Sequence, residues 1–262
     1  MNKAIDQLFS LQGQNVLVTG GSRGLGLQMA EALGDAGATV FLTARSAVDL
    51  QQAATALQAR NIVTHWEAGD ASDATEVRRV CAAAIDRMGH VDILVNNAGA
   101  SWGAPAEDYP LEAWDKVMNL NVRSVFLFSQ FLAKNSMIPR KEGRIINLAS
   151  IKGLMGNAEH DDIIAYNASK AAVINMTRAL AGEWGEHGIT VNAIAPGWFP
   201  SKMTRGMIDF RGYEQMASRA PLRRLGDDED LKGATLLFAS RAGKHITGQI
   251  LAVDGGVSAV GD

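Results

Sequence analysis

Short, nearly continuous apolar runs alternate with longer stretches of helical pattern along almost the whole chain. Runs such as Val16-Leu17-Val18 and Ile93-Leu94-Val95 show no polar alternation, which is typical of parallel strands that are buried on both faces. Parallel strands that are joined through helices form repeated right-handed βα units. The sequence therefore predicts an α/β fold: a single doubly wound parallel sheet of about seven strands with helices on both faces.

The expected elements follow from these runs. We expect strands at 15–19, 39–43, 63–67, 91–96, 144–148, 190–194 and 249–253, and helices at 24–36, 48–60, 73–88, 111–136, 164–186 and 227–239. The helical region 111–136 is long enough to be broken. No linker rich in Pro, Gly or Ser divides the 262 residues, so we expect a single domain, 1–262, with a small helical excursion near 198–221 beside the substrate.

The charge pattern argues against nucleic-acid and membrane partners. The net charge is −3 and the charges are interspersed. No apolar run is long enough for a membrane helix, and Met1 to Gln14 lacks the apolar core of a secretory signal. The single cysteine, Cys81, lies in an apolar stretch and is expected to be a small buried hydrophobe. We expect a cytoplasmic protein, and no metal site is predicted.

A glycine-rich segment joins the first expected strand to the first expected helix. In Thr19-Gly20-Gly21-Ser22-Arg23-Gly24-Leu25-Gly26, three glycines form a G-x-x-x-G-x-G pattern. Glycine permits a tight turn and close approach of the backbone to a pyrophosphate, and a helix N-terminus favours negative charge. A glycine-rich turn without a ligand is the alternative. The candidate cofactor contacts here are Gly20, Ser22, Arg23, Gly24, Leu25 and Gly26.

The end of the second expected strand bears on the choice of cofactor. A carboxylate there would bond the ribose 2′-OH of NAD, but this strand ends in Thr43-Ala44-Arg45. Arg45 and Arg23 together match a 2′-phosphate through forked, charge-assisted hydrogen bonds. We therefore expect NADP(H) rather than NAD(H), unless both arginines are only exposed surface charges.

Tyr166 and Lys170 are spaced to share one face of a helix. A nearby cation favours the phenolate and would lower the pKa of the tyrosine, which makes Tyr166 a candidate proton-transfer group. Ser150, sixteen residues upstream, could hydrogen-bond the same reacting oxygen. Taken alone, the Tyr-x-x-x-Lys spacing also arises by chance on solvated helices.

These motifs together resemble the short-chain dehydrogenase/reductase family, from about Leu11 to Val257. The resemblance also rests on Asp70, Asn96-Asn97-Ala98-Gly99, Asn121, Pro196-Gly197 and Asp254-Gly255-Gly256. It implies a Rossmann-type fold and hydride transfer between a nicotinamide and a ketone or secondary alcohol. It also implies a homotetramer built on the long helices near 111–136 and 164–186.

The resemblance implies roles for individual residues. The implied catalytic residues are Asn121, which would hold a water, Ser150, Tyr166 and Lys170. The implied cofactor contacts are Asp70 and Ala71 at the adenine, Asn97, Ala98 and Gly99 over the cofactor, Tyr166 and Lys170, Pro196 and Gly197 beside the nicotinamide, and Thr204. In the alternatives, Asp70 only caps a helix, Asn121 only bonds backbone, and Pro196-Gly197 is only a turn.

The substrate is less constrained. Bulky apolar residues near the motifs suit a hydrophobic ketone or acyl chain, with ordinary loop packing as the alternative. Lys152 could bind a substrate carboxylate or phosphate. The candidate substrate residues are Trp102, Lys152, Trp198, Phe199 and Met203.

Within the family, two groups look nearest: NADPH-dependent 3-oxoacyl (β-ketoacyl) reductases and gluconate 5-dehydrogenases. The resemblance thus favours a 3-oxoacyl-type or other hydrophobic ketone, with sugar-acid oxidation as the alternative and a non-catalytic dinucleotide sensor as the alternative of another class. Lys141 matches a carrier-protein docking position, but His187 stands where arginine is expected, which leaves coenzyme-A thioesters and free ketones open. The interval from Ser150 to Tyr166 is longer than usual in the family, with extra residues in 155–162 that should alter the pocket rim.

Overall fold

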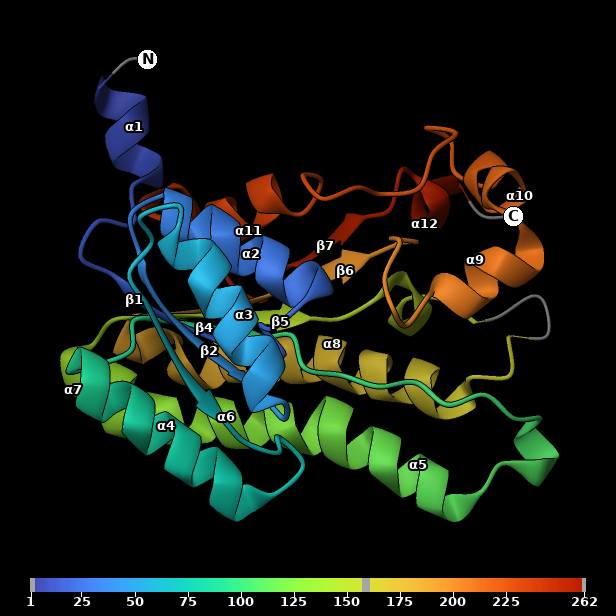
Figure 1. Ribbon diagram of the computed structural model, residues 1–262, viewed down its shortest axis with the longest axis horizontal. Helices are drawn as coiled ribbons and strands as arrows, with labels where there is room; N and C mark the ends of the chain where they lie inside the picture. Colours follow the sequence, from blue (N-terminus) through green and yellow to red (C-terminus); the bar gives the residue numbers. More distant parts are fainter. Residues whose placement is uncertain (1–2, 157–160, 261–262) are drawn as a thin grey trace.

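A computed structural model describes residues 3–156 and 161–260. It confirms the predicted fold class, because the strands form a single parallel sheet flanked by helices (Figure 1). In the described residues the sheet has seven strands in the order β3-β2-β1-β4-β5-β6-β7. Their bounds are β1 Asn15–Thr19, β2 Thr39–Ala44, β3 Thr64–Ala68, β4 Ile93–Asn96, β5 Gly143–Leu148, β6 Ile189–Pro196 and β7 Ile250–Val253.

Helices cover the two faces of the sheet (Figure 1). One face carries α2 (Gly24–Asp35), α3 (Ala47–Gln58) and α11 (Lys232–Ala239), and the other carries α4 (Ala74–Met88), α5 (Leu111–Met118), α6 (Ser124–Leu132) and α8 (Ile164–Trp184). The remaining α-helices of the described residues are α1 (Lys3–Phe9), α7 (Ile138–Arg140), α9 (Arg205–Arg211), α10 (Tyr213–Ser218) and α12 (Val257–Val260).

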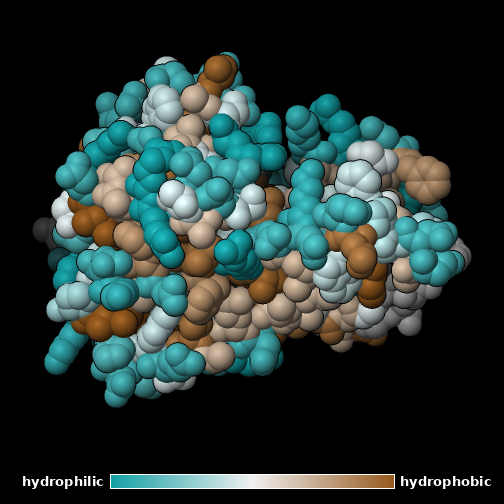
Figure 2. Space-filling model, turned by 90° about the horizontal axis from the view of Figure 1, so that it is seen from below, coloured by the Kyte–Doolittle hydropathy of each residue, from teal (hydrophilic) through white to brown (hydrophobic). Residues whose placement is uncertain are grey.

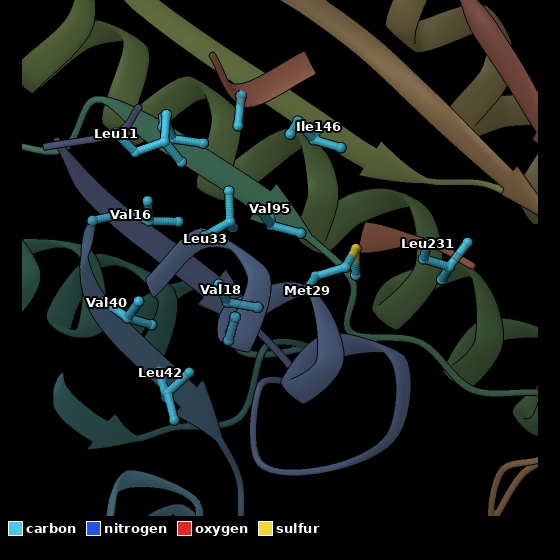
Figure 3. Packing of buried hydrophobic residues seen from close by; sticks show 14 of the residues in the cluster. Leu11, Val16, Val18, Met29, Leu33, Val40, Leu42, Val95, Ile146 and Leu231 are labelled. Carbon is cyan, nitrogen blue, oxygen red and sulfur yellow. The ribbon is translucent and has the colours of Figure 1, made fainter. Parts of the chain in front are cut away.

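Each face of the sheet has its own hydrophobic core. Val16 and Val18 of β1 pack with Met29 and Leu33 of α2 (Figure 3), whereas Leu17 between them packs on the opposite face. All five side chains are fully buried. This alternation explains the unbroken apolar runs, because successive side chains of a strand point to opposite faces and both faces are covered.

One long helical region is interrupted, as its length suggested, and another helix begins later than predicted. In the region 111–140, two π-helical turns, Asn119–Arg123 and Ala133–Met137, separate α5, α6 and α7. The helix expected from Asp227 begins only at Lys232. Asp230 instead accepts hydrogen bonds from the Asp227 N–H and the Arg224 guanidinium, which holds the acidic segment in a turn.

The chain order reverses between β1 and β4. β1 pairs with β2 on one side and with β4 on the other, so the connections leave in opposite directions and open a crevice at the carboxyl ends of the strands. The segment 198–221 contains α9 and α10, which lie beyond the end of β6 (Figure 1). The crevice is therefore the place to look for a ligand.

The outer surface mixes polar and apolar side chains. On the face seen in Figure 2, hydrophobic residues lie between hydrophilic ones. In the described part of the chain, none of the helices combines the length and apolar character needed to span a bilayer.

Candidate active site

A cleft of about 1180 Å³ lies at the carboxyl ends of the strands. It brings together most of the residues that the sequence singled out, although they come from segments far apart in the chain. The predicted residues that line it are Gly20, Ser22, Arg23, Gly24, Leu25, Arg45, Asp70, Ala71, Asn97, Ala98, Gly99, Ser150, Tyr166, Lys170, Pro196, Gly197, Phe199, Met203 and Thr204.

The glycine loop needs its glycines for two different reasons. Gly20 and Gly24 have positive φ angles of 63° and 55°, a region that other residues rarely adopt. Gly26 does not line the cleft. A Cβ there would overlap the side-chain nitrogen of Asn97 and the carbonyl oxygen of Gly20, so Gly26 allows α2 to pack closely against the loop. The structure thus gives Gly26 a packing role, and a direct contact with the cofactor stays a prediction.

Asn97 and Thr19 tie the glycine loop to the turn after β4. The Asn97 side-chain nitrogen donates to the carbonyl oxygens of Thr19 and Gly20, at 2.9 and 3.0 Å. The Thr19 hydroxyl accepts the N–H groups of Asn97 and Ala98, each at 3.0 Å. Both cleft walls are therefore fixed to one another by hydrogen bonds within the protein.

The two predicted arginines lie at the same end of the cleft. Arg23 reaches Asp49, with Nη1 3.2 Å from Oδ2, and Arg45 lines the cleft beside it. Ser46 also lines this corner, where it caps α3 by accepting the N–H of Asp49 at 3.2 Å. Our sequence reasoning missed Ser46, although a serine three residues before an aspartate at a helix start is a capping signal.

Asp70 does not cap the following helix. Asp73 caps α4 instead, and Asp70 accepts the N–H and the hydroxyl of Ser72, at 2.9 and 2.7 Å. These hydrogen bonds, with a smaller contribution from the charge of Arg45, lower the pKa of Asp70. The carboxylate is thus held ionised in the cleft, and the capping alternative is wrong.

Ser150, Tyr166 and Lys170 converge at the other end of the cleft. Tyr166 and Lys170 lie one turn apart on α8, with the Lys170 ammonium 5.6 Å from the centre of the Tyr166 ring. Lys170 Nζ donates to the carbonyl oxygen of Leu148 at 2.6 Å. The Ser150 side chain lies close enough to the Tyr166 phenol to lower its pKa through hydrogen bonding. The structure therefore places a phenol, a hydroxyl and an amine around one point.

The pKa of Tyr166 moves opposite to the sequence-based expectation. Burial raises it above its ordinary value, and the hydrogen bond with Ser150 opposes this only in part. Burial also lowers the pKa of Lys170 to about 8. The reason for the difference is desolvation: it disfavours both charged forms, and it weakens the cation that was expected to stabilise the phenolate.

Asn121 lies behind the cleft rather than in its wall. Its side chain is fully buried and is bonded to the Ala100 N–H and carbonyl, at 2.8 and 2.9 Å, and to the Ser169 hydroxyl at 2.9 Å. Ser169 in turn donates to the carbonyl oxygen of Tyr166 at 2.7 Å. The side chain of Asn121 therefore anchors the turn at Ala100 to α8, and it does so from within a π-helical turn, a feature frequent at functional sites.

The turn after β6 is tightly packed. The Gly197 N–H donates to the carbonyl oxygen of Val253 at 2.9 Å, and a Cβ at Gly197 would come within 2.7 Å of the Asp254 side chain. The Thr204 hydroxyl donates to the carbonyl oxygen of Phe199 at 2.6 Å and accepts the Ser201 N–H at 2.9 Å. Thr204 thus lines the cleft with its hydroxyl already used by its own loop.

The candidate substrate residues are divided between different places. Phe199 and Met203 line the cleft, whereas Trp102, Lys152 and Trp198 do not. Trp102 is half exposed and accepts a hydrogen bond from Tyr109 at its carbonyl. Position in the sequence near a motif does not determine the direction of a side chain, and a substrate contact by these three residues stays a prediction. Of the inserted region, 157–160 lies outside the described residues.

Three cleft residues on the substrate side were missed by sequence reasoning. Lys202, Arg205 and Ile208 line the cleft from the loop before α9 and from α9 itself. Lys202 and Arg205 are cations. The helix α9 is too short for its sequence pattern to show which of its sides faces the cleft.

The cleft has the features that a dinucleotide requires. A Cβ at Gly20 would come within 2.8 Å of the Asn97 side chain, so glycine there lets the loop pack closely against the turn after β4. Lys170 is 5% exposed, and a Cβ at Gly99 would lie 3.7 Å from its nitrogen, so the missing side chain leaves room beside the ammonium. The residues present therefore fit a pyrophosphate at one end of the cleft and a reactive ring at the other.

Comparisons with known proteins agree over nearly the whole chain. The family profile described as enoyl-(acyl carrier protein) reductase matches residues 20–258. The chain is 42% identical to the rhamnolipids biosynthesis 3-oxoacyl-(acyl-carrier-protein) reductase of Pseudomonas aeruginosa, over 95% of this chain and 97% of that protein. It is 39% identical to the gluconate 5-dehydrogenase of Gluconobacter oxydans, over 96% and 97%.

A solved structure gives the same result for the fold. The crystal structure of a gluconate 5-dehydrogenase from Burkholderia cenocepacia, in complex with NADP and tartrate, matches with a TM-score of 0.92 and 32% identity, over 98% of this chain and all of that one. Agreement of this extent in both sequence and structure leaves one conclusion: the chain belongs to the short-chain dehydrogenase/reductase family.

Proposed function

We propose that this protein is an NADP(H)-dependent oxidoreductase that interconverts a ketone and a secondary alcohol. The observation that carries the proposal is the convergence of Ser150, Tyr166 and Lys170 at one end of a cleft whose other end is the glycine loop. The membership of the family supports the reaction type.

The residues of this chain would manage the proton and the developing charge. A bound nicotinamide dinucleotide supplies or accepts the hydride. The hydroxyls of Ser150 and Tyr166 donate hydrogen bonds to the substrate carbonyl oxygen, where negative charge develops. Tyr166 then transfers its proton to that oxygen, and its raised pKa makes the neutral, proton-bearing phenol the resting form. Lys170, held by Leu148, stands where it can stabilise the resulting phenolate.

NADP(H) rather than NAD(H) is supported at the opposite end of the cleft. Arg23 and Arg45 would hold a 2′-phosphate, with the hydroxyl of Ser46 beside them. The strand β2 ends without a carboxylate that would prefer a free ribose hydroxyl. The related structure from Burkholderia cenocepacia contains NADP.

For the substrate, a 3-oxoacyl-type or other hydrophobic ketone is the first proposal. Phe199, Met203 and Ile208 give the cleft an apolar wall on the substrate side. A sugar acid is the second candidate, because Lys202 and Arg205 line the same side and could pair with a carboxylate. Relatives of both kinds exist at about equal identity.

A spectrophotometric screen tests this function. Purified protein is given NADPH or NADH with 3-oxoacyl thioesters, 5-ketogluconate and simple cyclic ketones, and oxidation of the cofactor is followed. The proposal expects NADPH-dependent turnover with at least one class. Binding of NADPH without turnover of any carbonyl compound would instead favour a dinucleotide sensor, and a preference for NADH would refute the role given to the two arginines.

We also infer a homotetramer that works in the cytoplasm. The inference rests on the family resemblance and on apolar side chains, such as Leu111 and Phe126, that remain exposed on α5 and α6. A cytoplasmic location accords with a single cysteine that is buried and reduced in the described structure.

A further inference from the structure

A buried cluster of charges lies beside the cleft and has no part in the chemistry proposed above. The side chain of Asp161 is only 3% exposed, and its two oxygens contact two different cations. Oδ2 lies 2.5 Å from Lys152 Nζ, and Oδ1 lies 2.7 Å from Arg211 Nη2. The two cations are 17% and 14% exposed. Such a desolvated bridge differs in strength from the solvated surface pairs of the molecule.

The two cations come from two separate elements beside the cleft, η4 and α9. Lys152 lies in the 3-10 turn η4 (Ile151–Gly153), which begins directly after Ser150, and its N–H donates to the Ser150 hydroxyl at 3.1 Å. Arg211 is the last residue of α9, the helix that brings Arg205 and Ile208 to the substrate side of the cleft. Asp161 therefore connects the backbone at the reacting serine to the helix that faces the substrate.

Trp198 extends this connection to a third segment. The Lys152 ammonium lies 5.7 Å from the centre of the Trp198 ring, within the range of a cation–π contact. Trp198 follows the Pro196-Gly197 turn and packs against Met216 and Leu225, beside the end of α10 and the loop after it. The same lysine thus touches the carboxylate and the segment that leads into α9.

We propose that Asp161 is a positioning residue that holds α9 at a fixed distance from Ser150 and so sets the width of the substrate side of the cleft. The proposal rests on the proposed function, since it concerns the carbonyl substrate of the same site. Removing one partner of a buried ion pair takes away an attraction that offset the desolvation of the remaining charges. Neutralising Asp161 removes the carboxylate that Lys152 and Arg211 share, and α9 is then held less closely to η4.

A double-mutant cycle on the intact protein tests the proposal. The variants are Asp161→Asn, Arg211→Gln and their combination, with Asp162→Asn as the matched control. Asp162 is the neighbouring exposed carboxylate, and its φ of 50° suits asparagine. Asp161→Asn should raise the KM of the carbonyl substrate about tenfold with a smaller fall in kcat, because α9 positions the substrate. The double variant should resemble Asp161→Asn alone, because the ion pair that Arg211→Gln removes is already lost when Asp161 is neutralised.

Two further measurements separate positioning from general loss of stability. Affinity for NADPH, measured by fluorescence titration, should stay within about twofold of the unmodified protein, since the arginine end of the cleft is remote from Asp161. Amide hydrogen exchange across α9 should become faster in Asp161→Asn without any substrate present. The exchange measurement needs no turnover, so it tests whether Asp161 holds α9 in place even if the proposed function fails.

Four outcomes would overturn the role of Asp161. The first two are a KM for the carbonyl substrate that is unchanged in Asp161→Asn, and effects of the two single variants on KM that multiply in the double variant. The other two are an NADPH affinity that weakens as much as KM rises, and an amide exchange rate of α9 that is unchanged in Asp161→Asn. If Asp161→Asn does not fold, Arg211→Gln carries the same KM and exchange measurements. Absence of turnover in the unmodified protein would count against the proposed function alone.

Discussion

The Lys170 ammonium lies 5.6 Å from the centre of the Tyr166 ring, and it donates its hydrogen bond to the Leu148 carbonyl oxygen. The lysine is therefore fixed by β5, the strand that also leads to Ser150. Its position beside the phenol does not depend on a ligand. The amine and the phenol are both buried, and burial shifts their pKa values toward the neutral forms.

Removal of the Tyr166 hydroxyl should abolish proton transfer. Tyr166→Phe is expected to lower kcat by ~10²–10⁴ or more, while NADPH still binds, because the arginines and the glycine loop are untouched. NADPH oxidation and fluorescence titration measure the two effects separately. Full turnover in this variant would show that another group supplies the proton.

The buried amine of Lys170 should make stability depend on pH. Its pKa is lowered from an ordinary 10.5 to about 8. Between these values the unfolded chain binds more protons than the folded one, so this lysine makes stability rise as pH increases through that window. Lys170→Met should therefore be more stable than the unmodified protein at pH 7, by up to roughly 3 kcal/mol.

This advantage of Lys170→Met should shrink as the pH passes from 8 toward 10.5. Denaturant unfolding of both ligand-free proteins across this range measures the difference. A stability difference that is equal at both ends of the range would mean that the lysine is not desolvated as the structure indicates.

Loss of the arginine at the end of β2 should affect one cofactor only. Arg45→Ala is expected to weaken NADPH binding about 10- to 100-fold through the loss of charge-assisted bonds, and to leave NADH binding nearly unchanged. Arg60→Ala serves as the control, because Arg60 is paired with Glu31 and Asp35 on the surface and does not line the cleft. An equal loss for both cofactors would place the effect elsewhere than at a 2′-phosphate.

Two glycine-to-alanine changes should have opposite effects on stability. Gly26→Ala places a methyl group against Asn97 and Gly20 and should destabilise the fold by about 1–3 kcal/mol. Gly182→Ala lies inside α8 with open space around the new methyl group, so it should stabilise by about 0.5–1 kcal/mol. Thermal and denaturant unfolding compare the pair. Equal tolerance of both changes would contradict the packing role given to Gly26.

Light scattering should give the mass of a tetramer, about four times the 27.9 kDa of one chain. A mass near that of one chain would refute the homotetramer. Phe126→Glu on α6 should lower the mass if that helix is in the interface, because it places a charge among apolar side chains.

The sheet could be predicted from the sequence because burial on both faces leaves little choice of residue. The continuous apolar runs at Val16 and Ile93 predict strands because both of their faces are buried. The π-helical turn around Asn121 could not be predicted, since one extra residue in a turn leaves the apolar pattern almost unchanged. The tie between Asp161 and Arg211 also escaped prediction, because it joins side chains fifty positions apart that only the folded chain brings together.

The site was predictable where the backbone itself forms it. The need for glycine at positions 20 and 24 could be predicted from the sequence, because other residues rarely adopt the positive φ angles of Gly20 and Gly24. The pKa of Tyr166 was predicted in the wrong direction, since a neighbouring cation can be read from spacing but the loss of water around both groups cannot. On the substrate side, Trp102 and Trp198 do not line the cleft, because nearness to a motif in the sequence does not fix the direction of a side chain.

Different kinds of interaction fix the two ends of the cleft: main-chain hydrogen bonds at the glycine loop and a side-chain ion pair at α9. Asn97 bonds the glycine loop through main-chain oxygens, whereas Arg211 at the end of α9 pairs with the carboxylate of Asp161. Selectivity for the carbonyl substrate could therefore be changed by exchanging the segment 198–221 together with Asp161. Such a graft would keep the glycine loop, Arg23 and Arg45, which makes the segment a modular target for directed evolution.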